Sequence, residues 1–107
     1  MLRVATYNAH DCIGRDRVYS PERIAQVVSD LNADAVALQE ITLDHAGDLL
    51  AELERATGMR AIDGTLFERG VGRYGNLLLT RHPVLGQRVH DLSFPGREPR
   101  GIVDAEL

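Results

Sequence analysis

The sequence has no tryptophan, a single cysteine and no long apolar run. The lone Cys12 excludes an internal disulfide, and no apolar run approaches the ~20 residues that a membrane-spanning helix needs. The N-terminus carries no apolar signal core, so we expect a cytoplasmic protein without a transmembrane segment. Basic residues are also scarce, since 12 Lys+Arg stand against 16 Asp+Glu. This acidic balance and an aromatic content of 5% argue against sequence-independent binding of nucleic acid. Such binding depends on basic residues that release counterions from phosphates and on aromatic residues that stack on bases.

The composition is otherwise that of a globular domain. A chain of 107 residues with 44% hydrophobic and 26% charged residues is neither a fibre nor a disordered tail. The last run, 101–107, alternates like a half-buried strand and then stops without a turn or a cap. We therefore expect residues 1–107 to form a single but incomplete domain.

The first half of the chain predicts a βαβ unit. Residues 2–8 favour a strand, and a helix then begins with Ser20 as its N-cap and Pro21 as its first residue. The helix is predicted to end at Asn32. Its apolar residues recur at helical spacing on one face, and they are Ile24, Val27, Val28 and Leu31. The short apolar run 34–40 predicts a second strand, parallel to the first through a right-handed crossover.

A second helix is predicted over 43–57, with Leu49, Leu50 and Leu53 turned inward and Gly58 closing it. No helical period returns after residue 58. The remaining extended runs predict antiparallel strands added to the parallel pair, at 59–63, 76–80, 84–92 and 101–107. The expected fold is α/β, with one mixed sheet and two helices on one of its faces.

Two polar residues end the first two predicted strands. Asn8 and Glu40 should meet at one edge of the sheet, because the carboxyl ends of parallel strands lie together and open α/β folds bind ligands there. A carboxylate and a carboxamide at that edge suit a hard cation such as Mg²⁺. On spacing alone, an equally simple interpretation is that Glu40 caps the next helix and Asn8 satisfies a turn.

Four segments resemble, in order, segments of the endonuclease/exonuclease/phosphatase superfamily. These metal-dependent phosphoesterases include exonuclease III, pancreatic deoxyribonuclease, sphingomyelinases and inositol polyphosphate 5-phosphatases. The segments are Thr6-Tyr7-Asn8, Ala37-Leu38-Gln39-Glu40-Ile41, the run from Gly72 to Pro83, and Arg97-Glu98-Pro99-Arg100-Gly101.

The resemblance implies a role for each matching residue. Glu40 would be a direct ligand of Mg²⁺ or Mn²⁺, and Asn8 would contact the metal, its waters or the scissile phosphate. Arg100 would reach toward the phosphate or brace the acidic cluster, while Tyr74 and Asn76 would border the substrate. For the last three residues the alternatives are a solvated loop arginine, an ordinary loop residue and an ordinary strand start.

The family hydrolyses phosphodiester or phosphomonoester bonds, which implies a small-molecule, lipid-headgroup or nucleic-acid substrate. Its general base and second acidic site come from a Gly-Asp-x-Asn block and a late Asp-His pair, and the sequence contains neither in that context. The resemblance therefore implies the N-terminal half of a two-sheet α/β sandwich. By itself this half is expected to be inactive.

Other patterns favour structural interpretations. Asp44-His45 is expected in the first turn of the second helix, where the helix dipole favours an acidic residue. The glycines of Gly70–Gly75 match G-x-G-x-x-G but precede a strand, so they do not predict a dinucleotide site. Adjacent His10, Asp11 and Cys12 lack the spacing of a zinc site and predict a loop near the ligand edge.

A non-catalytic interpretation also stays open. In the complete family fold a second sheet covers the inner face of the first, so here that face would be a large apolar patch. The chain would then be an assembly module that covers the patch with another copy of itself or with a partner.

Overall fold

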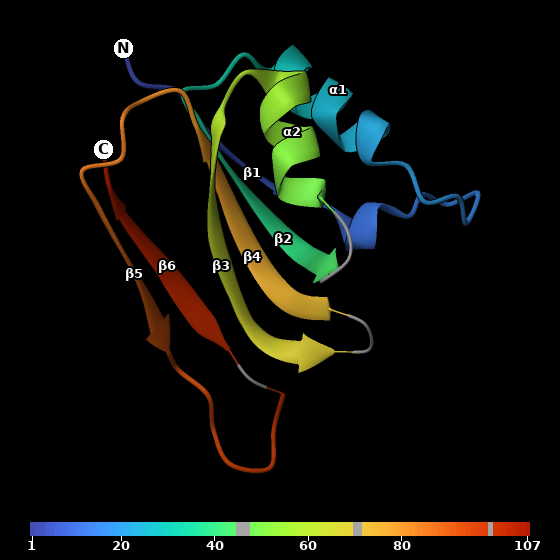
Figure 1. Ribbon diagram of the computed structural model, residues 1–107, viewed down its shortest axis with the longest axis vertical. Coiled ribbons are helices and arrows are strands. Elements are labelled where there is room, and N and C mark those ends of the chain that lie inside the picture. Colours follow the sequence, from blue (N-terminus) through green and yellow to red (C-terminus); the bar gives the residue numbers. More distant parts are fainter. Residues whose placement is uncertain (45–47, 70–71, 99) are drawn as a thin grey trace.

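The computed structural model describes residues 1–44, 48–69, 72–98 and 100–107. Two helices lie on one face of a curved four-stranded sheet, and a pair of strands lies on the other side of the sheet, next to β3 (Figure 1). In chain order the elements are β1 (Val4–Asn8), the short 3-10 helix η1 (His10–Cys12), α1 (Pro21–Leu31), β2 (Ala35–Asp44), α2 (Leu49–Thr57), β3 (Arg60–Arg69), β4 (Gly72–Thr80), β5 (Gly86–Asp91) and β6 (Gly101–Glu106).

The four-stranded sheet has the order β1-β2-β4-β3. β1 runs parallel to β2, as the βαβ pattern predicts, and β4 is antiparallel to both β2 and β3. β4 takes the interior position because it is the most apolar of the later strands, with Leu77 and Leu79 fully buried. β3 begins with Arg60 and includes the exposed Asp63, and it forms the edge instead. Both strands are longer than their predicted runs, which mark only where their apolar residues lie.

The first helix begins and ends where the sequence predicts. Ser20 occupies the N-cap position with extended backbone, Pro21 follows, and Asn32 ends the helix in the left-handed conformation. The capping chemistry differs from expectation, since the Ser20 hydroxyl donates to Glu22 Oε2 at 3.0 Å and makes no cap bond to the helix backbone.

The second helix is shorter than predicted. It spans Leu49–Thr57 and closes at Gly58 as expected, but residues 43 and 44 belong to β2. The prediction that Asp44 lies in the first helical turn is therefore wrong, because β2 continues past Glu40 and pairs Asp44 with Gly72 of β4. Glu40 lies inside a strand and does not cap a helix. His45 lies outside the described residues.

One apolar cluster joins the helices to the sheet. Val28 of α1 and Leu53 of α2 are each 1% exposed and pack with the inward residues of β2 and β4. The cluster comprises Ala9, Cys12, Ile24, Ala25, Val28, Ala33, Val36, Leu38, Ile41, Leu49, Leu53, Met59, Leu77 and Leu79. This core anchors the carboxyl ends of β1 and β2, which carry the candidate site.

β5 and β6 do not join the four-stranded sheet but form an antiparallel pair of their own. The pair contacts β3 and β4, and Val103 of β6 lies directly against Gly64 of β3. Ile62, on the same face as Gly64, is only 2% exposed. The expectation of a wholly open inner face is therefore wrong at the β3 edge, where β6 covers it. At the β1 edge, Val4 is 63% exposed.

In the part of the chain that the structure describes, no helix has the length and apolar character needed to cross a membrane.

Candidate functional site

Asn8 and Glu40 meet at the carboxyl ends of β1 and β2, as the parallel register requires. Asn8 pairs with Gln39, and its side-chain amide nitrogen donates a hydrogen bond to Glu40 Oε2. The backbone N–H of Ala9 continues the pairing by donating to the carbonyl of Gln39 at 2.9 Å. The predicted proximity of the two residues is thus a direct side-chain contact.

A β-bulge sets the direction of the Glu40 side chain. The register of β2 against β4 shifts between Leu38 and Ile41, both of which are 0% exposed although strand alternation would place them on opposite faces. Without the bulge, Glu40 would follow Val36 and Leu38 into the apolar core. Its φ of +55° lies in the left-handed region, which costs an L-residue about 1 kcal/mol. The bulge keeps the carboxylate 41% exposed.

The turn that follows β1 brings His10 and Asp11 to the same edge. The backbone N–H of His10 donates to Asn8 Oδ1 at 3.0 Å, and its Nδ1 lies 3.9 Å from Glu40 Oε1. Asp11 Oδ1 accepts a hydrogen bond from the hydroxyl of Thr42 at 2.7 Å. Asn8 thus holds Glu40 with its nitrogen and the turn with its oxygen.

Sequence reasoning placed His10 and Asp11 in a loop near this edge but gave them no role there. The signal that could have found His10 is the Asn8-Ala9-His10 spacing, because asparagine side chains commonly accept the N–H two residues on. Asp11 had no such signal, since its contact with Thr42 depends on the bulge.

Cys12, the next residue of the turn, is buried in the core. Its side chain belongs to the core cluster and is 3% exposed. Burial, aided by the charge of Asp11, raises the pKa of the thiol to about 11.

Asn76 and Tyr74 lie on β4 beside the bulge. Leu77 pairs with Leu38 and Gly75 with Ile41, so Asn76 stands opposite the residues that form the bulge. Tyr74 pairs with Thr42, whose hydroxyl holds Asp11. The sheet therefore aligns Asn8, Glu40 and Asn76 on three neighbouring strands, with Tyr74 one pleat further along.

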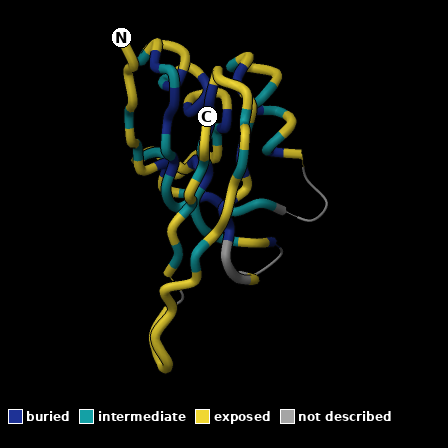
Figure 2. The backbone as a smooth tube through the Cα atoms, turned by 90° about the vertical axis from the view of Figure 1, so that its left-hand side faces the viewer, coloured by how far each residue is buried: buried dark blue, intermediate teal, exposed yellow. Residues whose placement is uncertain are grey.

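Arg100 lies elsewhere in the fold. It ends the connection between β5 and β6, an exposed loop that projects beyond the rest of the protein (Figure 2). Its Nη1 is 3.0 Å from Glu98 Oε2, and its backbone N–H donates to Ser93 Oγ at 3.2 Å. β6 begins directly after Arg100 and contacts β3 and β4. The predicted contact of Arg100 with phosphate stays a prediction.

The glycine-rich pattern at 70–75 does not form a nucleotide loop in its described part. Gly72 to Gly75 lie inside β4, while residues 70 and 71 lie outside the described residues. A phosphate-binding glycine loop opens a helix after a strand, and this segment is itself a strand.

The residues at the edge fit part of a magnesium site. Mg²⁺ commonly binds one or two carboxylates and keeps several waters, and the half-exposed carboxylate of Glu40 suits such a role. Among residues 1–44, 48–69, 72–98 and 100–107, however, no three His, Cys, Asp or Glu side chains gather closely enough to hold a metal ion. Glu40 and its support Asn8 are thus part of a possible metal site and not a complete one within the described chain.

The chain is similar to one family of known proteins. Residues 5–106 match the profile of the Endonuclease/Exonuclease/phosphatase family. No curated protein matches the chain significantly.

Two solved structures are similar to this chain. An endonuclease/exonuclease/phosphatase from Beutenbergia cavernae DSM 12333 is 26% identical, with a TM-score of 0.74 over 97% of this chain and 33% of that one. An endonuclease/exonuclease/phosphatase family protein from Leptotrichia buccalis C-1013-b is 17% identical, with a TM-score of 0.70 over 98% of this chain and 49% of that one. This chain therefore spans about a third and about half of the lengths of the two proteins.

Proposed function

The chain belongs to the endonuclease/exonuclease/phosphatase family, and from that premise we propose that it forms the portion of a phosphoester hydrolase that supplies the first metal ligand. The observation that supports this role is the half-exposed Glu40 carboxylate, turned out of the core by a bulge and held by Asn8. β-Bulges and left-handed backbone at a residue other than glycine are both features that recur at functional sites.

Glu40 would hold Mg²⁺, with Mn²⁺ as the alternative, and the ion would stabilise charge on the ester oxygens during attack by water. Asn8 orients the carboxylate by donating to Oε2, and Oε1, on the side of His10, would be the oxygen that binds the ion. Asn76 and Tyr74, across the sheet from the bulge, would contact the substrate. The reaction cleaves a phosphorus–oxygen ester bond of a phosphodiester or a phosphomonoester.

The 107-residue chain alone would be inactive. Hydrolysis needs a base to take the proton of the attacking water. The sequence has no Gly-Asp-x-Asn block, and its one Asp-His pair, Asp44-His45, follows the Glu40 segment and does not come late as in the family. The two similar structures are two to three times as long as the stretch they share with this chain, which is consistent with a site completed by further residues.

The metal role of Glu40 can be tested without turnover. Substoichiometric Mn²⁺ added to the ¹⁵N-labelled chain should broaden the amide signals of His10, Gln39 and Ile41, because they lie around the Glu40 carboxylate. Glu40→Gln should abolish this broadening, whereas Glu106→Gln on the exposed end of β6 should leave it intact. Equal broadening in Glu40→Gln would remove the basis of the proposed function. In parallel, the chain should hydrolyse bis-p-nitrophenyl phosphate no faster than a blank, and turnover would show that the base is already present.

A second candidate, a module that assembles with another copy, is supported by apolar side chains around β5 and β6. Leu85, Phe94 and Ile102 are 71%, 71% and 50% exposed. Burial of such residues between two copies would favour a dimer. Sedimentation across a range of concentrations should then show self-association, and a monomer at every concentration would exclude this candidate.

A further inference from the structure

A short projecting arm follows the candidate site in the chain. It comprises Ile13–Tyr19, whose two ends form an antiparallel bridge, and it stands out from the molecule beside α1 (Figure 1). At its base the backbone N–H of Ser20 donates to the carbonyl of Cys12 at 2.7 Å. A turn at its tip is closed by the N–H of Arg17, which donates to the carbonyl of Gly14 at 2.9 Å.

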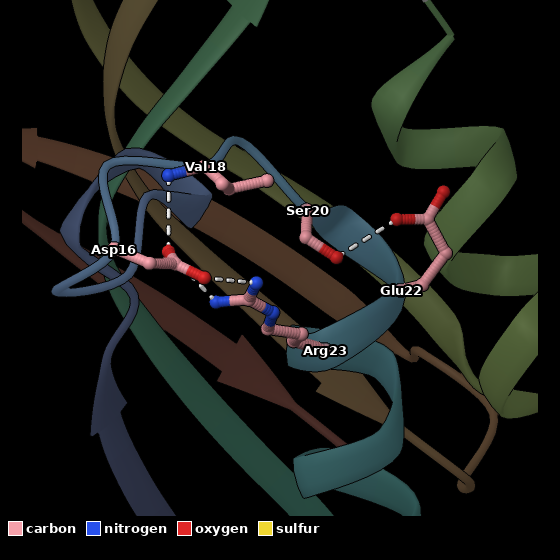
Figure 3. Close-up of polar contacts among 5 residues, drawn as sticks. All are labelled: Asp16, Val18, Ser20, Glu22 and Arg23. Atoms are coloured by element: carbon pink, nitrogen blue, oxygen red, sulfur yellow. Dashed lines mark hydrogen bonds and ion pairs between the residues drawn. The ribbon is translucent and has the colours of Figure 1, made fainter.

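The arm is held in one conformation by Asp16. Both oxygens of this carboxylate accept hydrogen bonds from the guanidinium of Arg23 on α1, at 2.5 and 3.1 Å, and Oδ1 also accepts the N–H of Val18 at 3.0 Å (Figure 3). Gly14 leaves the room for this pairing, because a Cβ there would lie 2.5 Å from Arg23 Nη1. An arm fixed in advance loses little conformational entropy when it binds a ligand.

The same pairing makes the arm positively charged. Arg23 lowers the pKa of Asp16 to about 2, so the carboxylate stays ionised and its charge is neutralised by Arg23. Arg15 and Arg17, on either side of Asp16, are exposed, and within the described residues neither side chain has a polar partner. The arm thus carries two exposed arginines two residues apart, on a chain whose formal charge is −4.

Backbone hydrogen bonds connect the arm to the Glu40 edge. Cys12 at the base of the arm donates from its N–H to Ala9, and Ala9 donates to Gln39, the neighbour of Glu40, each at 2.9 Å. The base of the arm is thus tied through Ala9 to β2, the strand that carries Glu40.

We propose that the Ile13–Tyr19 arm is a second anion-binding site, in which Arg15 and Arg17 bind a phosphate group of the substrate other than the one that reacts. The inference rests on the proposed function, since it assigns that function a substrate with at least two phosphate groups. Guanidinium groups suit this ligand because their donors match phosphate oxygens in pairs. The second phosphate could come from a nucleotide chain or from a phosphorylated inositol headgroup, which share this chemistry.

The test compares ligands that differ by one phosphate. Inositol 1,4-bisphosphate and inositol 1-phosphate, and likewise thymidine 3′,5′-bisphosphate and thymidine 5′-monophosphate, are titrated into the ¹⁵N-labelled chain in Mg²⁺. Each bisphosphate should bind more tightly than its monophosphate and shift the amide signals of residues 13–19. The double variant Arg15→Gln/Arg17→Gln should lose about tenfold in bisphosphate affinity, with little effect on the monophosphate. The inositol and nucleotide pairs then show which source of the second phosphate fits better.

Two controls separate the possible failures. Arg88→Gln on β5 removes one exposed positive charge outside the arm and should leave the preference for bisphosphate over monophosphate unchanged. Glu40→Gln should abolish Mn²⁺ broadening but keep the shifts at residues 13–19, so a failure of the metal role is distinguishable from a failure of the arm. Equal affinity for mono- and bisphosphates would overturn the proposal. So would a preference for bisphosphates that survives the double variant Arg15→Gln/Arg17→Gln, or one that Arg88→Gln removes to the same extent.

Discussion

The side-chain amide of Asn8 donates to the carboxylate of Glu40 across 32 residues of sequence, and it is the contact that joins β1 to the candidate ligand on β2. The Asn8 oxygen meanwhile accepts the N–H of His10, so both ends of the amide are engaged. Asn8 therefore orients Glu40 and the following turn together.

Replacement of Asn8 by alanine should weaken metal binding without removing it. The Glu40 carboxylate would remain but lose the donor that orients it, and loss of such supporting contacts typically costs 10- to 100-fold in metal affinity. In the Mn²⁺ experiment the variant should need about tenfold more metal for the same broadening. Thr6→Ala, which removes the acceptor of the Gln39 side chain, is the matched control. Unchanged metal dependence in Asn8→Ala would show that the contact does not orient the ligand.

Addition of a methyl group at Gly64 should loosen the contact between β6 and the main sheet. A Cβ at this position would lie 2.0 Å from Val103 Cγ2 and 2.9 Å from the carbonyl oxygen of Asn76, so Gly64→Ala should lower the free energy of unfolding by about 1–3 kcal/mol. Urea denaturation measures the loss. Gly86→Ala, whose new Cβ would meet only Glu106 Oε2 at 3.9 Å, should change it little.

The cause of that loss can be tested with a double variant. Val103→Ala removes the methyl group that Gly64→Ala meets, so the two substitutions together should cost less than the sum of their separate effects. Strict additivity would mean that Val103 does not press on residue 64.

The pairing of Asp16 with Arg23 predicts an acid-sensitive contribution to stability. The pKa of Asp16 is lowered from 3.8 to about 2 in the folded chain, so its contribution is complete above 3.8 and is lost as the pH falls toward 2. The free energies of unfolding of the wild type and of Asp16→Asn, measured between pH 2 and pH 3.8 and just above, should differ most at the upper end of this range and converge at the lower end. Asp30→Asn on α1 serves as the control for removal of an acidic residue. A difference that stays constant with pH would contradict the pairing.

The buried Cys12 should resist thiol reagents while the chain is folded. Its pKa of about 11 leaves almost no thiolate at mildly alkaline pH, and its side chain is 3% exposed. Reaction with a disulfide reagent should therefore be slow in the folded chain and fast in denaturant. Rapid labelling of the folded chain would place Cys12 at the surface.

The parts of the fold that follow from local chemistry could be predicted. Pro21 and Asn32 bound α1 in sequence as they do in the structure, and Gly58 closes α2. The start of α2 could not be predicted, because the run to Asp44 satisfies both a helix and a strand pattern and only pairing with β4 decides between them. Such choices depend on tertiary contacts that no local signal carries.

Part of the candidate site could likewise be predicted from the sequence and part could not. The meeting of Asn8 and Glu40 follows from the parallel βαβ unit, which the sequence already predicts. The bulge at Glu40 does not, because it arises from the competing demands of Leu38 and Ile41, both of which enter the core. The position of Arg100 was likewise out of reach, since it depends on β5 and β6 forming a sheet of their own.

The strand order also bears on how the chain folds as it leaves the ribosome. β2 and β3 are synthesised first, yet each takes β4 as its antiparallel partner, so their permanent pairing waits until Thr80 has emerged. Until then β2 can pair with β1 alone, and β3 lacks its partner in the sheet. Because β4 is made after β2 and β3 but lies between them, we expect the sheet to be completed from its middle, when β4 enters between two strands that are already synthesised.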